Sequence, residues 1–204
     1  MFKALIEMKK LTPRYCRISR LIRDIPTPDI EAGNIITNLR EYLSEEMKKQ
    51  GTVCQCLRCR EIGHNKDLGL KTADLRLFID TYETAGGTEY FLSFEDPKRQ
   101  AVFAFLRLRI PSEKNDKMEK YLPETKDVAF IRELHTYGQL VDVGKQNKKA
   151  SQHKGMGKKL VKEAERIAEK NGFEKLAVIS GVGVRGYYRK IGYKKRGTYM
   201  IKKI

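Results

Sequence analysis

Hydrophobic residues recur along the chain with two periods, and the first is helical. This spacing runs through residues 34–50, where Asn34 is a candidate N-cap and Gly51 a candidate stop. It returns over residues 155–170, which an Asn-Gly pair at 171–172 closes. We therefore predict an amphipathic helix in each segment.

The second period, alternation combined with short continuous apolar runs, predicts strands. Residues 75–82, 88–94 and 101–110 are three such segments, and the turn residues at 86–87 and 96–97 predict an antiparallel meander. The remaining expected elements are a short strand or helix and an extended linker within 1–31, a strand at 130–143 after the polar connection 112–127, a buried strand at 176–180, a short helix at 184–190 and a last strand at 198–204.

Composition adds a strong positive charge. The 204 residues carry 42 Lys and Arg against 26 Asp and Glu, a net charge of +16, and most of the excess lies after Pro111. This balance favours a polyanionic ligand or partner, the alternative being a basic face that only keeps the protein in solution. The chain has no apolar run of the roughly 18 residues that a membrane span needs and no export signal at its start. We therefore predict a soluble, cytoplasmic protein that binds no membrane.

A glycine-rich segment, Gln152-His153-Lys154-Gly155-Met156-Gly157, leads from the fourth predicted strand into the second predicted helix. Glycines there let backbone amides approach an anion, and the helix dipole adds roughly half a positive charge. Lys154, Lys158 and Lys159 reinforce that charge. The segment predicts a phosphate site, although two glycines at a helix start also occur by chance.

This order of elements resembles the GNAT acetyltransferase superfamily, whose pyrophosphate loop, Q/R-x-x-G-x-G/A, is matched by Gln152, Gly155 and Gly157. The resemblance covers roughly residues 74–204. It implies an α+β fold, with a mixed, mostly antiparallel sheet flanked by helices, and acetyl-CoA bound between two splayed strands. The coenzyme-binding residues that it implies are Leu134, Gln152, His153, Lys154, Gly155, Met156, Gly157, Lys158, Tyr187 and Tyr188.

The same resemblance implies a tyrosine facing the coenzyme sulfur. The segment 186–193 is similar to the Y/F-Y-x-x-x-G-F/Y pattern of these enzymes, so Tyr187 and Tyr188 are the candidates. A phenol with a pKa of about 10 is a reasonable proton donor to a departing thiolate. Because neighbours on a helix point in different directions, we expect at least one ring to be part of the core.

Glu133 and His135 are candidates for a catalytic base, because GNAT enzymes often place a base on the fourth strand. Strand alternation puts both side chains on one face. The alternative is a partly buried pair that neighbouring backbone groups satisfy.

Longer strings resemble the C-terminal half of the catalytic subunit of Elongator, and they span most of the chain. They are RDIP at 23–26, NLR at 38–40, CREIG at 59–63, FLSFEDP at 91–97, LRLR at 106–109, RELHTYG at 132–138 and AVISGVGVRGYYRKIGY at 177–193. In that family a radical S-adenosylmethionine domain, with its iron-sulfur cluster, joins a GNAT domain. The two modify the wobble uridine of tRNA, U34, to a carboxymethyluridine type with acetyl-CoA as carbon donor, and tRNA stimulates acetyl-CoA cleavage.

The chain departs from that family in one large respect. The cluster signature C-x-x-x-C-x-x-C is missing, with the roughly 200 residues of the radical domain's barrel. We therefore expect this chain to bind acetyl-CoA without completing the radical step. The expected parts are a radical-domain tail and linker at 1–33, a helix and zinc knuckle at 34–72 and a GNAT domain at 73–204. The expected protein partners are a second copy or a radical half.

A cysteine-rich knuckle provides metal ligands. Cys54, Cys56 and Cys59, with His64 five residues on, supply three thiolates and an imidazole, which suit a tetrahedral Zn²⁺. Cys16 is the alternative to His64, and an exposed redox cluster is the alternative to a metal site. The Elongator resemblance also implies zinc at such a site.

Arginines near the N-terminus suggest contact with phosphates. Arg14, Arg17, Arg20 and Arg23 form a strip, for which the Elongator resemblance makes tRNA the phosphate source. The same arginines could instead pair with acidic residues of a further domain. Two other functions stay open: a protein-lysine or small-molecule N-acetyltransferase, and a non-catalytic, zinc-stapled RNA-binding module.

Overall fold

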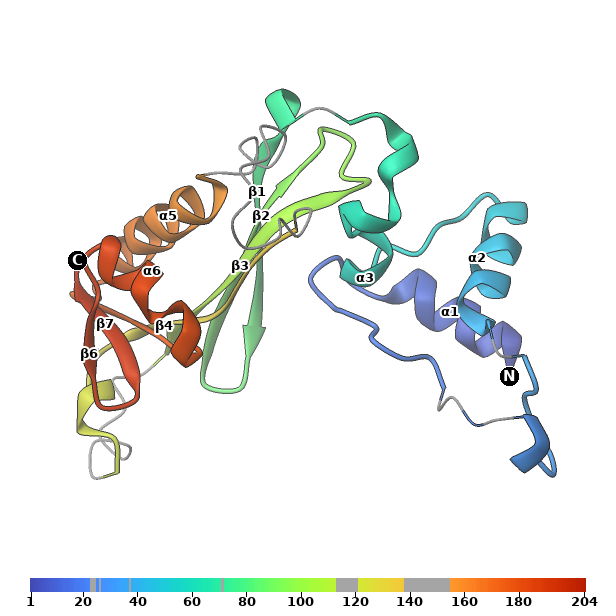
Figure 1. Ribbon diagram of the computed structural model, residues 1–204, viewed down its shortest axis with the longest axis horizontal. Helices are drawn as coiled ribbons and strands as arrows, with labels where there is room; N and C mark the ends of the chain where they lie inside the picture. The colour runs from blue at the N-terminus through green and yellow to red at the C-terminus, as the bar shows by residue number, and fades with distance from the viewer. Residues whose placement is uncertain (23–24, 26, 37, 71, 113–120, 138–154) are drawn as a thin grey trace. The chain divides into compact units, whose positions relative to one another are not determined.

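The computed structural model of the chain describes residues 1–22, 25, 27–36, 38–70, 72–112, 121–137 and 155–204 (Figure 1). The chain divides into two compact units, Met1–Asn65 and Lys66–Ile204. None of the described helices is long and apolar enough to cross a membrane.

The first unit is helical. Its elements are α1 (Phe2–Leu11), the 3-10 turn η1 (Thr27–Asp29), α2 (Leu39–Lys49), α3 (Leu57–Arg60) and η2 (Ile62–His64). Helices α1 and α2 pack together around a core of Ile6, Leu39, Leu43 and Met47. This small core buries the apolar stripes of both helices.

Helix α2 begins later than the sequence pattern predicts. The predicted cap, Asn34, uses its side-chain amide to donate to the carbonyl of Ile36 at 2.9 Å, and Ile35 is exposed. The helix begins after Asn38, whose carbonyl accepts from the amide of Tyr42 at 3.3 Å. The prediction of a helix was correct, but its start at residue 34 was wrong.

The second unit contains one mixed sheet. Its strands lie in the order β1-β2-β3-β4-β5-β7-β6, and all neighbours are antiparallel except β4 and β5, which are parallel. The strands are β1 (Arg76–Thr84), β2 (Gly87–Glu95), β3 (Val102–Pro111), β4 (Ala129–Thr136), β5 (Lys175–Val178), β6 (Lys194–Arg196) and β7 (Tyr199–Lys203). The predicted meander is confirmed as β1, β2 and β3.

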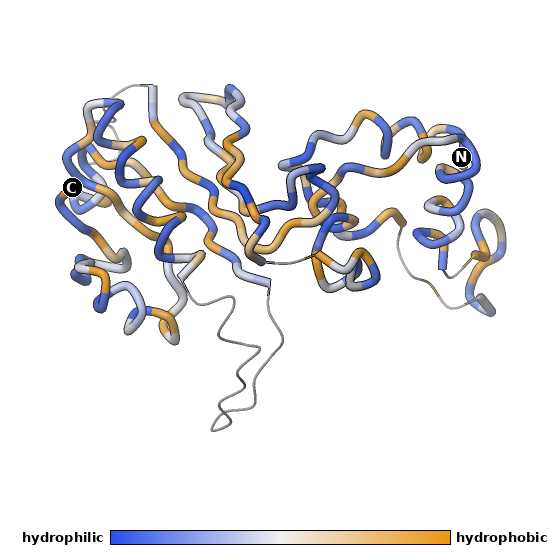
Figure 2. The backbone as a smooth tube through the Cα atoms, turned by 90° about the horizontal axis from the view of Figure 1, so that it is seen from above, coloured by the Kyte–Doolittle hydropathy of each residue, from blue (hydrophilic) through white to orange (hydrophobic). Residues whose placement is uncertain are grey.

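Helices of the second unit complete the α+β fold. They are α5 (Met156–Lys170) and α6 (Arg185–Lys190), with the 3-10 turns η3 (Lys66–Leu68), η4 (Thr72–Asp74), η5 (Pro123–Thr125) and η7 (Val182–Val184). Helix α5 packs against β3 and β4 with Leu160, Val161 and Ala164 buried. Hydrophobic and hydrophilic stretches alternate along the helices and strands, as expected for amphipathic elements with one face toward the core and one toward solvent (Figure 2).

In the sheet, one predicted strand ends at a different residue and one strand was not predicted. Strand β4 ends at Thr136 rather than at 143, and residues 138–143 of that prediction lie outside the described part of the chain. Strand β6 was missed because Lys194–Arg196 has no apolar position; it forms by pairing its backbone with β7. The β1–β2 turn was predicted correctly. It requires Gly87, since an added Cβ there would lie 2.3 Å from the carbonyl oxygen of Ile110.

Candidate coenzyme site and cysteine cluster

The start of helix α5 is the first candidate site. Its N-cap, Gly155, has φ +109 and ψ −21, a left-handed conformation that side chains rarely adopt. None of the described residues has an atom within 4 Å of a Cβ built there, so among them backbone conformation rather than space favours glycine. The first amides of a helix have no partner within it and carry its positive dipole end. Gln152, His153 and Lys154 lie outside the described residues.

Tyr187 places its hydroxyl against this helix start. A Cβ built on Gly157 would lie 3.0 Å from the Tyr187 hydroxyl and 3.7 Å from Cγ2 of Thr136, at the end of β4. The hydroxyl oxygen is buried and has no hydrogen-bond partner among the described residues. Burial raises the pKa of this phenol above its ordinary value. The structure thus brings Gly157, the end of β4 and a free phenol together.

Tyr188 lies deeper than Tyr187. Its ring packs edge-on against those of Tyr187 and Tyr193, with centroid distances of 5.2 and 5.7 Å, and the residue is 5% exposed. Burial, and then the charge of Tyr187, raises the pKa of Tyr188 to about 12. Tyr193 donates its hydroxyl proton to Oε1 of Glu165 at 3.0 Å. Tyr188 is therefore a core ring, as expected for at least one of the pair.

Glu133 and His135 lie on β4 just beyond an irregularity in its pairing with β3. Leu108 faces Ile131 whereas Arg107 faces Glu133, so Arg132 is an extra residue on β4. Arg107 donates from Nε to Oε2 of Glu133 at 3.0 Å. Both candidate bases are exposed.

The surroundings of His135 and Leu134 follow from the same register. The His135 ring lies 5.8 Å from the Phe105 ring and 4.5 Å from the Tyr137 ring, measured between centroids. His135 faces Phe105 and Glu133 faces Arg107; because each pair of positions is two residues apart along its strand, His135 and Glu133 share one face. Leu134 faces Leu106 and is directed to the opposite face.

Buried charges on this sheet were missed by the sequence analysis. Glu89 is fully buried, and its Oε1 accepts from Arg132 at 2.6 Å and from Arg109 at 3.4 Å. Arg99 joins Glu95 to Asp80, donating to each at 3.0 Å. The sequence signal that could have indicated them is a charged residue at a position that strand alternation directs toward the core of an otherwise apolar strand.

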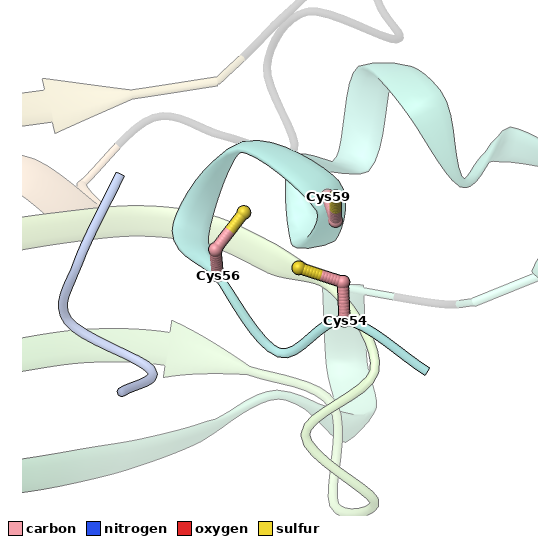
Figure 3. Close-up of side chains that lie close together, drawn as sticks. All are labelled: Cys54, Cys56 and Cys59. Atoms are coloured by element: carbon pink, nitrogen blue, oxygen red, sulfur yellow. The ribbon is translucent and has the colours of Figure 1, made fainter. Parts of the chain in front are cut away.

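The cysteine cluster forms as the spacing predicts. Cys54 and Cys56 lie on the loop before α3 and Cys59 lies within that helix, with the three side chains gathered around one small space (Figure 3). Their sulfur atoms lie within 4.8 Å of one another. Hydrogen bonds from Cys54 and Cys59 lower the pKa of the Cys56 thiol, and backbone amides of Cys59 and Ile18 add to this. Such a set can hold a soft, tetrahedral cation.

The two candidates for a fourth ligand lie apart from this group. Among the described residues the group contains the three cysteines alone. His64 is half exposed, and its Nε2 lies 3.6 Å from Oε2 of Glu61. Cys16 uses its backbone carbonyl to accept from the amide of Leu57 at 2.8 Å.

The predicted arginine strip is partly engaged within the first unit. Arg17 forms an ion pair with Glu61, which also accepts from Arg58 at 2.7 Å. The carbonyl of Arg14 accepts from Arg60 at 2.8 Å, which fixes the backbone of the strip. Arg20 is exposed, and Arg23 lies outside the described residues.

Comparison with known proteins gives a consistent relationship. No protein-family model matches the chain. The tRNA uridine(34) acetyltransferase of Methanocaldococcus jannaschii is 43% identical over 201 residues, which are 94% of this chain and 36% of that protein. Elongator complex protein 3 of Danio rerio is 42% identical over 200 residues, or 95% of this chain and 35% of that protein.

A solved structure agrees with these relatives. The archaeal Methanocaldococcus infernus Elp3 with an N-terminal deletion has a TM-score of 0.84 and 40% identity, covering 100% of this chain and 48% of that chain. The chain spans about a third of the length of the curated relatives it matches. It is therefore homologous to the C-terminal portion, about 200 residues long, of Elongator complex protein 3 and tRNA uridine(34) acetyltransferase, and it has an α+β fold.

Proposed function

We propose that this chain is the acetyl-CoA-binding acetyltransferase domain of an enzyme that modifies tRNA at wobble uridine 34. The observation that carries this proposal is the start of α5, where a left-handed Gly155 precedes Gly157, and Gly157 faces a Tyr187 hydroxyl that has no hydrogen-bond partner among the described residues. Relatives more than 40% identical over nearly the whole chain bear the name tRNA uridine(34) acetyltransferase. The place of these residues at the helix start, their chemistry and the similarity to these relatives all support a coenzyme site at the start of α5.

The coenzyme pyrophosphate would lie on the backbone amides that open α5. Gly155, Met156, Gly157 and Lys158 form this first turn, and Gln152–Lys154 precede it in the sequence. Four free amides and the helix dipole favour a dianionic ligand. Met156 and Gly157 are buried while Lys158 is exposed. The first turn therefore has its buried residues on the inner side and the positive charge of Lys158 on the solvent side.

Tyr187 would then stand beside the thioester and protonate the departing thiolate. Its phenol keeps its proton at neutral pH, because burial raises its pKa. Tyr188 supports this role by packing against the Tyr187 ring. Glu133, held by Arg107, and the exposed His135 are the groups available to accept a proton from the acyl acceptor.

The cysteine cluster would hold a structural Zn²⁺. Three sulfurs within 4.8 Å of one another fit the thiolate ligands that zinc prefers. When bound, the metal would cross-link the loop before α3 to α3 itself. A further ligand would come from His64, Cys16 or solvent.

tRNA would be the polyanionic partner of the basic surface. The net charge of +16 favours a phosphate backbone. Within the predicted strip, Arg20 is exposed, whereas Arg17 is already paired with Glu61. Arg20 is therefore the described member of the strip that is most available to phosphate.

The proposal is tested by titrating the chain with acetyl-CoA and desulfo-CoA, with and without tRNA, while free thiol is measured. We expect coenzyme binding and thioester cleavage that tRNA stimulates. Transfer to amines without tRNA would instead identify an N-acetyltransferase, and absence of coenzyme binding a non-catalytic RNA-binding module.

A matched pair of variants locates the site. Gly155→Glu should abolish acetyl-CoA binding, because a carboxylate would face the pyrophosphate, and should leave metal content unchanged. Gly172→Glu is the control: this glycine also has a left-handed φ, +81, and no described residue lies within 4 Å of a Cβ built on it, but it lies beyond the opposite end of α5. Equal affinity in both variants would refute the assignment of the loop.

A further inference from the structure

Lys9 is a fully buried lysine in the first unit. It lies on α1, and the exposed fraction of the residue is 0%. Its Nζ donates to the Sγ of Cys59 at 3.8 Å, across 50 residues of sequence. Lysine is almost never fully buried without a partner, because removing an ammonium from water is costly. The position therefore requires negative charge nearby.

The Cys59 sulfur is the acceptor that the structure supplies for this charge. Among the described contacts of the Lys9 ammonium, Cys59 is the one hydrogen-bond acceptor. A sulfur that carries negative charge, as a metal-bound thiolate does, forms a charge-assisted hydrogen bond with an ammonium group. The geometry therefore makes Lys9 a cationic donor to the Cys59 sulfur.

Arg40 supplies a second cation to the same sulfur. Its Nη1 donates to the Cys59 Sγ at 3.7 Å. Its Nη2 donates to the carbonyls of Ile18 and Ser19 at 2.7 and 3.2 Å. These carbonyls fix the guanidinium, so its direction toward Cys59 is set by backbone rather than by the cluster.

We infer that Lys9 and Arg40 are outer-sphere cations of a three-thiolate metal centre, positioned by α1 and α2 to balance its charge at Cys59. The inference rests on the metal site proposed above. A divalent cation with three thiolates carries a net charge of −1, which an adjacent cation offsets. Because Lys9 lies one helical turn from Ile6 of the α1–α2 core, the centre and that core stabilise each other.

The donors are distributed unequally among the three sulfurs. Cys59 receives side-chain cations, while Cys56 receives the backbone amides of Cys59 and Ile18. Cys54 packs against the apolar core of α1 and α2. Loss of a cation should therefore change the Cys59–metal bond and leave the other two bonds nearly as they are.

Zinc affinity of the full 204-residue chain tests the inference. Lys9→Met keeps the length and apolar stem of the side chain but removes its charge. It should weaken zinc binding by about 10-fold or more, in the range typical of outer-shell partners, as measured by competition with a chromophoric chelator. Lys10→Met is the matched control: Lys10 is the next residue on α1 and pairs with Glu7 at 2.8 Å, so its affinity should stay at the native value.

Cobalt substitution gives a readout that a merely structural role would not change. Removing a cationic donor leaves the thiolate richer in electrons, so the sulfur-to-cobalt charge-transfer band of Lys9→Met should move to longer wavelength. Lys9→Arg should restore the native band. If circular dichroism shows that Lys9→Met does not fold, Arg40→Gln removes the second cationic donor and should shift the same charge-transfer band to longer wavelength.

The outcomes separate this inference from the metal proposal. A native chain that binds neither zinc nor cobalt refutes the metal site itself. A native chain that binds both, with native affinity and band position in the folded charge-removal variant, refutes the outer-sphere roles alone.

Discussion

The unpartnered hydroxyl of Tyr187 predicts that one substitution will raise stability and lower activity. A buried hydroxyl without a hydrogen bond costs about 1–3 kcal/mol, and within the described part of the chain the Tyr187 oxygen is such a group. Tyr187→Phe removes that oxygen and keeps the ring that packs on Tyr188. We expect the coenzyme-free chain to gain about 1 kcal/mol in its free energy of unfolding, or roughly 3 °C in Tm for a protein of this size.

Tyr193→Phe is the matched control for stability. Its hydroxyl donates to the Glu165 carboxylate at 3.0 Å, within the same aromatic group. A hydrogen bond to a charged group contributes about 1.5–3 kcal/mol, so this variant should be less stable than the native chain. The two substitutions delete the same atom and should shift stability in opposite directions.

The assays are thermal and urea unfolding without coenzyme, followed by thioester cleavage with acetyl-CoA and tRNA. Loss of a proton donor should slow cleavage in Tyr187→Phe by about 100-fold while the affinity for desulfo-CoA changes little. A Tyr187→Phe chain destabilised as much as Tyr193→Phe would show that the hydroxyl has a structural partner. Unchanged cleavage would refute its role as proton donor.

Three other predictions concern the metal, a buried ion pair and a buried phenol. Cys56→Ser should release zinc and expose residues 52–64 to proteolysis, checked by metal analysis and limited digestion; full metal retention would contradict the three-thiolate set. Arg99→Met leaves the fully buried Glu95 carboxylate without its guanidinium and should lower the free energy of unfolding by about 3 kcal/mol in urea; a loss below about 1 kcal/mol would contradict that pairing. Tyr188 has a pKa of about 12 in the fold against an ordinary 10.0, so between these values the unfolded chain has lost a proton that the folded chain keeps. Stability should therefore fall as pH rises through that window, and Tyr188→Phe should remove about one proton from the slope of unfolding free energy against pH; an identical slope in the variant would count against the buried phenol.

Elements with a clear apolar stripe and a local stop could be predicted from sequence. Helix α5 was expected at 155–170 and spans Met156–Lys170, because its buried stripe and its closing Asn-Gly pair agree. Strand β6 could not be found in this way, since three consecutive basic residues become a strand only by pairing with β7. The start of α2 was predicted too early because apolar residues before the helix continue its helical spacing.

In the candidate sites too, features set by neighbouring residues in sequence could be predicted, whereas features set by tertiary contacts could not. The cysteine cluster could be predicted because its three cysteines lie within six residues and a short helix brings their side chains together. Lys9 could not, because a lysine buried in an amphipathic helix looks like any exposed lysine in sequence. The difference between Tyr187 and Tyr188 also needed the structure, which shows one hydroxyl at Gly157 and one ring between two others.

Backbone amides at the start of α5 are the proposed contacts of the coenzyme pyrophosphate, and amide chemical shifts report on them directly. In a titration of ¹⁵N-labelled chain with acetyl-CoA, the amides of Gly155 and Gly157 should show the largest changes, while Gly172 at the other end of the helix should stay in place. Saturable binding with its largest shifts elsewhere, and with Gly155 and Gly157 unmoved, would contradict the proposed coenzyme site.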